Sequence, residues 1–302
     1  MQWGQIKTIF IICFLVLDVY LITQAVVNDN ENESIVITSP ETTSIEEKLV
    51  EEKINFDKVP KESPKATYIS AFWHTFTEEE IGQLEAKGQK VAYNDGMVYA
   101  EFEKPVPIKV ESTPEDITEI IGSKILFADQ YTFHHWNKDE NVMIFFQHYN
   151  NQPIFYNNGG LLMVFLNEKN EATSYFQAKQ EEIEQQAEEK EVSRPLEIVE
   201  VLLNEDKISE GDTISSMELG YHTFWPVGGV QAFVPTWKIS VNEAENVFYV
   251  NALDGRTINI NEVEFLTDIR EEANNLKALL ELKEEMEEQE ETEEEIEAEQ
   301  GE

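Results

Sequence analysis

Cysteine, basic residues and catalytic signature motifs are all scarce in this sequence. Cys13 is the only cysteine among 302 residues, which excludes an intramolecular disulfide and any metal site built from several thiolates. Lysine and arginine together number 22 against 61 acidic residues, so the formal net charge is −39. A chain this acidic repels phosphate backbones and anionic lipid headgroups. The composition therefore argues against nucleic acid as a partner.

Known catalytic motifs are also missing. The sequence contains no GxSxG, HExxH, P-loop or GxGxxG pattern. Among the five histidines, the adjacent His134 and His135 would point to opposite faces of a strand, so they cannot both bind one metal ion without a bulge. Carboxylates are so frequent that a close pair carries no information. We therefore predict no catalytic residue, no cofactor and no metal site.

The longest apolar run lies at the N-terminus, over residues 6–27. Its length of 22 residues is close to the ~20 that an α-helix needs to cross a bilayer. Lys7 lies at its start and acidic residues follow it, which predicts a cytoplasmic N-terminus and an extracytoplasmic bulk. A cleaved signal peptide is the alternative, but Thr23-Gln-Ala25 is a poor cleavage site. We expect residues 1–27 to be a short cytoplasmic end and a single-pass membrane anchor.

Asp18 interrupts this apolar run. An ionised side chain near the centre of a spanning helix costs about 2.5–3.5 kcal/mol on the insertion scale. Either Asp18 is protonated or near the interface, or it bonds to a polar group on a partner helix. Asp18 and the neighbouring Tyr20 are therefore predicted partner contacts.

The remaining chain predicts an α+β fold with much antiparallel sheet. Residues 28–64 are polar and acidic and are expected to be a tether. Turn signals then fall between β-branched and aromatic runs, at 94–96, 157–160, 227–229 and 254–255. We expect two α+β subdomains, 65–158 and 159–265, followed by an acidic helical or disordered tail, 266–302. Residues 271–302 hold 15 Glu and 2 Lys.

Helices are predicted at three places in these subdomains. Thr77 begins a capping box, Thr113 precedes a proline at the first helical position, and Ser193 precedes a run through Leu203 with one apolar stripe. Residues 180–191, QEEIEQQAEEKE, have helix-forming composition and almost no apolar face. They are expected to form an exposed helix or a hinge.

One aromatic stretch is difficult to bury completely. It runs ELGYHTFWP over residues 218–226 and is followed by a Gly-Gly turn. Part of it is a candidate protein-contact surface, because aromatic residues are enriched at such surfaces. The residues we single out there are Tyr221, His222, Phe224 and Trp225.

Several segments together resemble the YycI family, also called WalI. They are the anchor KTIFIICFLVLDVYL after Trp3, SRPLE from Ser193, ELGYHTFWPV, VQAFVPTW and YVNALDG up to Gly255. The resemblance covers the anchor and most of the exported part, and the acidic tail lies outside it. It implies a single-pass membrane protein of Gram-positive bacteria, mixed α+β and non-enzymatic. It also implies two partners, the sister protein YycH and the sensor histidine kinase WalK (YycG). The kinase acts through the response regulator WalR (YycF) on cell-wall metabolism.

Two other classes of function remain open at this point. A membrane-tethered enzyme or inhibitor acting on the cell wall would use the same compartment, and an adhesin-like structural module would need only an anchor. Turnover of wall material that is lost on mutation of one acid would favour the first. Full function with any apolar helix as anchor would favour the second.

Overall fold

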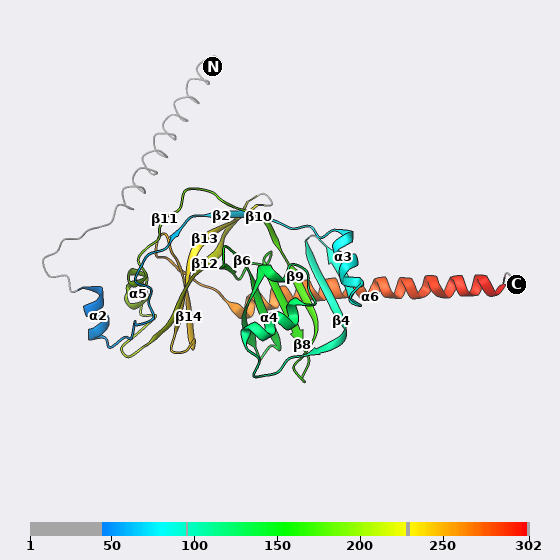
Figure 1. Ribbon diagram of the computed structural model, residues 1–302, viewed down its shortest axis with the longest axis horizontal. Coiled ribbons are helices and arrows are strands. Elements are labelled where there is room, and N and C mark those ends of the chain that lie inside the picture. The colour runs from blue at the N-terminus through cyan, green and yellow to red at the C-terminus, as the bar shows by residue number, and fades with distance from the viewer. Residues whose placement is uncertain (1–43, 95, 228–229, 301–302) are drawn as a thin grey trace, which may run out of the picture. The chain divides into compact units, whose positions relative to one another are not determined.

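The expected sheet-rich α+β fold is confirmed from Ile45 onward. A computed structural model describes residues 44–300 except 95, 228 and 229 (Figure 1). The residues from Ile45 onward form one compact unit. Its described strands make a 13-stranded sheet and a separate two-stranded ribbon. The large sheet is antiparallel apart from one parallel pair, β7 with β12.

Two lobes share the large sheet. We call residues 76–178 and 262–300 the α6 lobe. Its elements are α3 (Glu78–Glu85), β3 (Lys90–Asn94), β4 (Met97–Pro107), α4 (Pro114–Gly122), a 3₁₀ turn η1 (Ala128–Gln130), β5 (Tyr131–Asn137), β6 (Val142–Tyr149), β7 (Gln152–Phe155), β8 (Leu161–Leu166), β9 (Glu171–Ala178) and α6 (Glu262–Gln300).

Residues 45–73 and 180–258 form the other lobe, which we call the α5 lobe. Its elements are α2 (Ile45–Glu51), β1 (Lys65–Ala66), β2 (Ile69–Trp73), β10 (Gln180–Gln185), β11 (Lys190–Glu191), α5 (Pro195–Asn204), β12 (Ile214–Val227), β13 (Val230–Val241), β14 (Asn246–Asn251) and β15 (Thr257–Ile258). Strand β7 connects the lobes, because it pairs with β6 on one side and β12 on the other.

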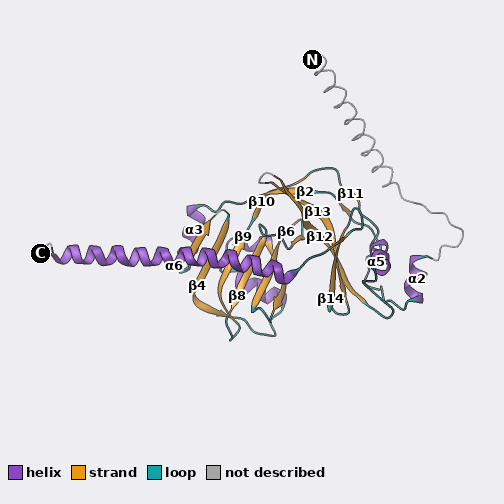
Figure 2. Ribbon diagram, turned by 180° about the vertical axis from the view of Figure 1, so that it is seen from behind, coloured by secondary structure: helices purple, strands orange, loops and turns teal. Residues whose placement is uncertain are grey.

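The sheet of the α6 lobe is buried on both faces. Alternate side chains of β6 divide between two cores, with Met143 and Phe145 in one and Ile144 and Phe146 in the other. Helices α3 and α4 cover the first face and α6 covers the second, as the front and rear views show (Figures 1 and 2). This explains why β6 and β8 are apolar at nearly every position.

Helix α6 corrects the expectation of a tail from residue 266. Its first half carries a buried stripe that packs on the sheet: Leu266, Ile269, Ala273, Leu276 and Leu280. The spacing of three or four residues puts these side chains on one face of a helix. Beyond Leu280 the described side chains are mostly exposed and acidic. The predicted solvated extension therefore begins about fifteen residues later than the predicted boundary at 266.

The α5 lobe also reaches further back along the chain than expected. Within the predicted tether of residues 28–64, helix α2 buries Leu49, and Ile54 and Val59 are buried behind it. All three pack in the core that α5 shares with β13 and β14. Residues 45–64 are therefore part of the folded body, while residues 28–43 lie outside the described residues.

The predicted helix starts are confirmed. Thr77 and Thr113 each close a capping box, accepting a hydrogen bond from the backbone N–H of Glu80 and Asp116. Helix α5 begins one residue later than predicted, with Arg194 at the N-cap position. Its buried stripe packs on the sheet as expected.

Residues 180–191 were predicted wrongly as a helix or hinge. They form β10 and β11, and β10 pairs with β2 across more than 100 residues of sequence. A bulge with Glu182 at φ 50° interrupts the pairing. Backbone pairing with a distant strand outweighs the local helix propensity.

The turn predictions have a mixed outcome. The hairpins at 94–96, 227–229 and 254–255 are confirmed by the pairing of the flanking strands. Residues 157–160 connect β7 to β8, which do not pair with each other. Strands β6 and β8, on either side of the boundary predicted at 158/159, pair directly in the α6 lobe.

None of the helices in the described part of the chain has the length and apolar character needed to cross a bilayer. The predicted span, residues 6–27, lies outside the described residues. The single-pass anchor therefore stays a prediction.

Candidate functional site

The partner-contact residues predicted in the anchor, Asp18 and Tyr20, lie outside the described residues. The other four lie on β12, just before its hairpin with β13. Tyr221 is 3% exposed and packs with Phe233 and Ile154 in a small core. Its ring is therefore not on the surface.

His222 and Phe224 have contrasting surroundings. The Nδ1 atom of His222 lies 2.9 Å from the carbonyl oxygen of Phe155. Burial lowers the pKa of His222, so Nδ1 carries the proton and donates to that carbonyl at neutral pH. Phe224 is 57% exposed and makes an edge-to-face contact with Tyr68. The side chain of Trp225 is not described, so Phe224 is the one predicted residue shown on the surface.

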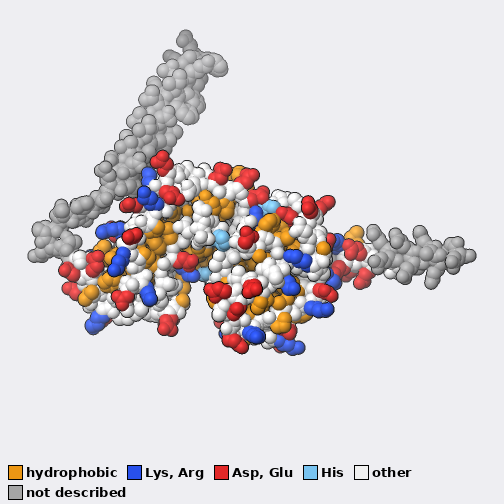
Figure 3. Space-filling view, in the orientation of Figure 1, with side chains coloured by type: hydrophobic (Ala, Val, Ile, Leu, Met, Phe, Trp, Pro, Cys, Tyr) orange, Lys and Arg blue, Asp and Glu red, His pale blue; other side chains and the backbone are white. Residues whose placement is uncertain are grey.

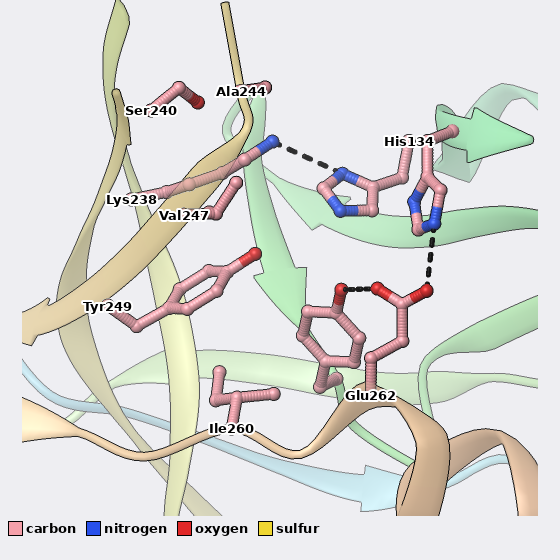
Figure 4. A pocket seen from close by; sticks show the side chains of 10 residues that line it. His134, Lys238, Ser240, Ala244, Val247, Tyr249, Ile260 and Glu262 are labelled. Atoms are coloured by element: carbon pink, nitrogen blue, oxygen red, sulfur yellow. Dashed lines mark hydrogen bonds and ion pairs between the residues drawn. The ribbon is translucent and has the colours of Figure 1, made fainter. Parts of the chain in front are cut away.

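A pocket of about 390 Å³ lies where the two lobes meet, and we call it the junction pocket. Strand β5 and the first turn of α6 supply one wall, and β13 and β14 supply the other (Figure 4). Its volume falls in the usual range for small-molecule sites. Val247 and Ile260 are apolar residues of its lining and lie on either side of Tyr249, and most of the other lining residues carry polar groups.

Glu262, the first residue of α6, is the negative group of the pocket. It accepts hydrogen bonds from the Tyr156 hydroxyl at 2.6 Å, from His135 Nε2 at 3.0 Å and from Asn137 Nδ2 at 3.0 Å. Burial alone would raise its pKa, but these hydrogen bonds outweigh burial and hold the pKa of Glu262 at about 2. Its carboxylate is therefore ionised and has its acceptor capacity largely satisfied.

Lys238 is the positive group, and it is incompletely paired. Its side chain is 17% exposed, and the nearest carboxylate oxygen, on Glu218, is 3.8 Å away. The ammonium also lies 3.4 Å from Nδ1 of His134. Burial, together with the Lys238 charge, lowers the pKa of His134 well below its usual range, so this ring is neutral and Nδ1 accepts. Burial lowers the pKa of Lys238 as well.

Tyr249 points its hydroxyl into the same pocket (Figure 4). The residue is 5% exposed, and its hydroxyl has no hydrogen bond of 3.5 Å or shorter among the described residues, although the Tyr156 hydroxyl lies near enough to influence it. Burial raises the pKa of Tyr249, so the phenol stays protonated and can donate. A buried hydroxyl without a partner costs free energy unless something else in the pocket satisfies it.

Buried amide side chains form a second polar feature of the junction. This amide cluster consists of Gln147, Asn157, Gln180 and Gln231. Asn157 donates to Gln231 at 2.6 Å and accepts from Gln180 at 3.1 Å. Gln147 bonds the backbone of Gln180 in both directions, at 2.7 and 2.8 Å. The cluster thus connects β6 and the β7–β8 loop of the α6 lobe to β10 and β13 of the α5 lobe.

His74 bridges two acidic residues outside the junction pocket. Its Nδ1 lies 2.5 Å from Glu181 and its Nε2 lies 3.1 Å from Glu80. Glu80 also accepts from the backbone N–H of Thr77, so the bridge connects the start of α3 to β10. No group of His, Cys, Asp or Glu side chains in the described part of the chain has the arrangement of a metal site.

The negative charge of the protein does not mark one site. Acidic side chains are spread over the face seen in Figure 3, with basic side chains among them. Several are paired across long stretches of sequence, for example Lys48 with Glu200 and Arg270 with Glu140. The charge therefore gives the surface a general repulsion for anions and does not by itself locate a partner.

Comparison with known proteins identifies the family. The YycI protein family model matches residues 32–253, which is most of the chain. The chain belongs to the YycI family. YycI proteins are regulatory proteins of two-component systems, so the resemblance seen in the sequence is confirmed at the level of the family. No curated protein matches the sequence significantly.

Two solved structures are similar to this YycI protein at a low level. An uncharacterized protein from Eubacterium rectale has 12% identity and a TM-score of 0.41, over 69% of this chain and 89% of that one. The C-terminal domain of Bacillus megaterium YpeB has 10% identity and a TM-score of 0.36, over 62% of this chain and 97% of that one. Likenesses this low establish neither a shared function nor a shared ligand.

Sequence reasoning missed the residues of the junction in this YycI chain. Lys238 lies between Trp237 and Ile239, which both face the core of the α5 lobe. Strand alternation therefore places Lys238 on the opposite face, and that face is covered by the other lobe. A lysine within a run of apolar strand residues was the available signal. Glu262 could not have been found this way, because its partners come from distant elements.

Proposed function

We propose that this YycI protein is a non-enzymatic, membrane-anchored regulator of a WalK-type sensor histidine kinase, acting together with a YycH-like sister protein. The observation that carries the proposal is the family match over residues 32–253. The apolar run at 6–27, with Lys7 at its start and acidic residues after it, supports an anchor with the folded body outside the membrane. Through WalR the kinase would then control cell-wall metabolism.

The proposed mechanism is a shift of the kinase between its signalling states. A bound regulator can bias such an equilibrium only if it contacts the states differently. The anchor residues Asp18 and Tyr20, the exposed Phe224 near the β12–β13 hairpin and the neighbouring Trp225 are the proposed contacts. A hydrogen bond from Asp18 to a partner helix would contribute about 0.6–2 kcal/mol, enough to orient a complex but not to drive its assembly.

Co-isolation from membranes tests the partners. The full-length chain, a version with an unrelated apolar helix in place of residues 6–27, and an Asp18→Leu variant are each expressed with the kinase and the sister protein. We expect the full-length chain to retain both partners, and the Asp18→Leu variant to insert normally but to retain less of them. Failure of the full-length chain to retain either partner would contradict the proposal.

A further inference from the structure

The junction pocket has the features of a ligand site. We propose that it binds a small organic carboxylate with an uncharged, partly apolar body, held by Lys238 and Tyr249 beside the apolar side chains of Val247 and Ile260. This inference goes beyond the regulatory function proposed above and does not depend on it. It rests on the chemistry of the pocket lining.

The first argument is the incomplete pairing of Lys238. An ammonium group has three N–H donors. In the structure it has one long hydrogen bond, to the neutral His134 ring, and a carboxylate at 3.8 Å on the half-exposed Glu218. At least one donor of a largely buried ammonium is therefore left without a close acceptor, and the pocket is the space beside it (Figure 4).

The second argument is independent and comes from Tyr249. Its hydroxyl is buried, lacks a partner among the described residues and lies in the same pocket. A phenol hydroxyl donates well to an anionic oxygen. On the opposite wall, the Glu262 carboxylate already accepts from Tyr156, His135 and Asn137. The Tyr156 hydroxyl is a neutral group and therefore a weaker acceptor than an anionic oxygen. One carboxylate group on a ligand would satisfy both Lys238 and Tyr249.

The volume of the pocket and its apolar lining residues constrain the rest of the ligand. The pocket holds about 390 Å³, enough for a molecule the size of an acylated amino acid or a short fatty acid. Val247 and Ile260 favour an apolar group in contact with them. The ionised Glu262 disfavours a second negative charge on the far side. A dicarboxylate or a phosphate ester is therefore a poorer fit than a monocarboxylate.

Binding is tested by titrating the full chain with N-acetylalanine, N-acetylleucine and hexanoate at about 0.15 M salt, where the general repulsion of the acidic surface is screened. The uncharged amides of the same three compounds are the matched ligands. We expect saturable binding of at least one acid with a Kd of about 1 mM or lower, and binding of its amide at least about tenfold weaker. Absence of saturable binding by all three acids, or equal binding of acid and amide, overturns the proposal.

Variants of the full chain locate the site and separate it from loss of folding. Lys238→Met should weaken binding about tenfold or more, and Tyr249→Phe about threefold to tenfold. Lys179→Met and Tyr99→Phe are controls, because these residues are similarly buried and lie outside the pocket. Unchanged binding by Lys238→Met, or equal losses in the controls, contradicts the assignment.

Glu218→Gln provides a test in the opposite direction. Its carboxylate competes for Lys238 and repels an incoming anion. Because Glu218 is half-exposed, its removal should not harm folding, and the acid should bind about twofold to threefold more tightly. Weaker or unchanged binding by this variant contradicts the role given to Lys238.

Discussion

The interior of the α6 lobe and the junction between the lobes are held together in different ways. In the lobe, a sheet with apolar side chains on both faces is covered by α3 and α4 on one side and α6 on the other. At the junction, buried amides and charges meet, and two buried polar atoms, Gln180 Oε1 and the Tyr249 hydroxyl, have no partner in the part of the chain that the structure describes. The lobe interior thus serves stability, while the junction holds the groups that can respond to a ligand or to pH.

The largest effect is expected where α6 covers the sheet. Leu276 is 3% exposed and Leu279, one turn away on the same helix, is 48% exposed. Leu276→Ala should lower the free energy of unfolding by about 2–4 kcal/mol, because it leaves a cavity between α6 and the sheet. Leu279→Ala should change it by less than about 0.5 kcal/mol. Denaturant unfolding of both variants measures this, and equal effects would mean that α6 does not pack as described.

The next effect is expected in the amide cluster. Asn157→Ala removes the partner of Gln180 and Gln231 and leaves their buried groups unsatisfied. The expected loss of stability is about 1–3 kcal/mol, and the neighbouring, exposed Asn158→Ala is the matched control. If Asn157→Ala unfolds at the same denaturant concentration as the wild type, the cluster does not hold the lobes together.

A smaller and pH-dependent effect is expected at Glu262. The folded-state pKa of about 2 lies below the ordinary value of 4.5, so the ionised carboxylate stabilises the fold above about pH 4.5. That contribution is lost as the pH falls from 4.5 towards 2. Because the group is partly exposed, we discount the shift to about 1–2 kcal/mol for Glu262→Gln at pH 7. In urea unfolding at several pH values, the free energies of unfolding of the wild type and the variant should converge as the pH falls below 4.5. A difference that does not change with pH would show that the ionised Glu262 carboxylate is not the source of the stabilisation.

The smallest effect is expected for the end of α6. The described side chains beyond Leu280 are mostly exposed, and their ion pairs, such as Lys283 with Glu287, are on the surface. Deleting residues 289–302 should change the free energy of unfolding by less than about 0.5 kcal/mol. A larger loss, seen by thermal or denaturant unfolding, would show that this acidic segment contributes to the fold.

What the sequence could predict was local. The capping boxes at Thr77 and Thr113 and the turn at 254–255 depend on residues within a few positions of each other, and the structure confirms them. Failures came where distant residues decide the outcome. Residues 180–185 have helix-forming composition but form a strand because β2 offers a pairing edge. The apolar residues of α6 have helical spacing in the sequence, but the many glutamates around them led to the prediction of an acidic tail.

The candidate site shows the same limit more strongly. The stretch 218–226 was predicted to be difficult to bury, and on β12 Tyr221 is buried while Phe224 is exposed. The junction pocket draws on β5 and on β13, β14 and α6, and its β5 residues, His134 and His135, precede Lys238 by more than 100 residues. No spacing rule brings His134, Lys238 and Glu262 together, because their proximity depends on how the two lobes share one sheet.

The most direct test of the central claim, that this YycI protein regulates a sensor kinase, is the rate of kinase autophosphorylation in membranes with and without the full chain. We predict that the full chain changes this rate at least about twofold, in line with an allosteric coupling. A protein with a scrambled residue 6–27 segment and the same folded body is the control and should change it less. An identical rate with and without the full chain, at levels where the kinase is saturated with it, would contradict the account.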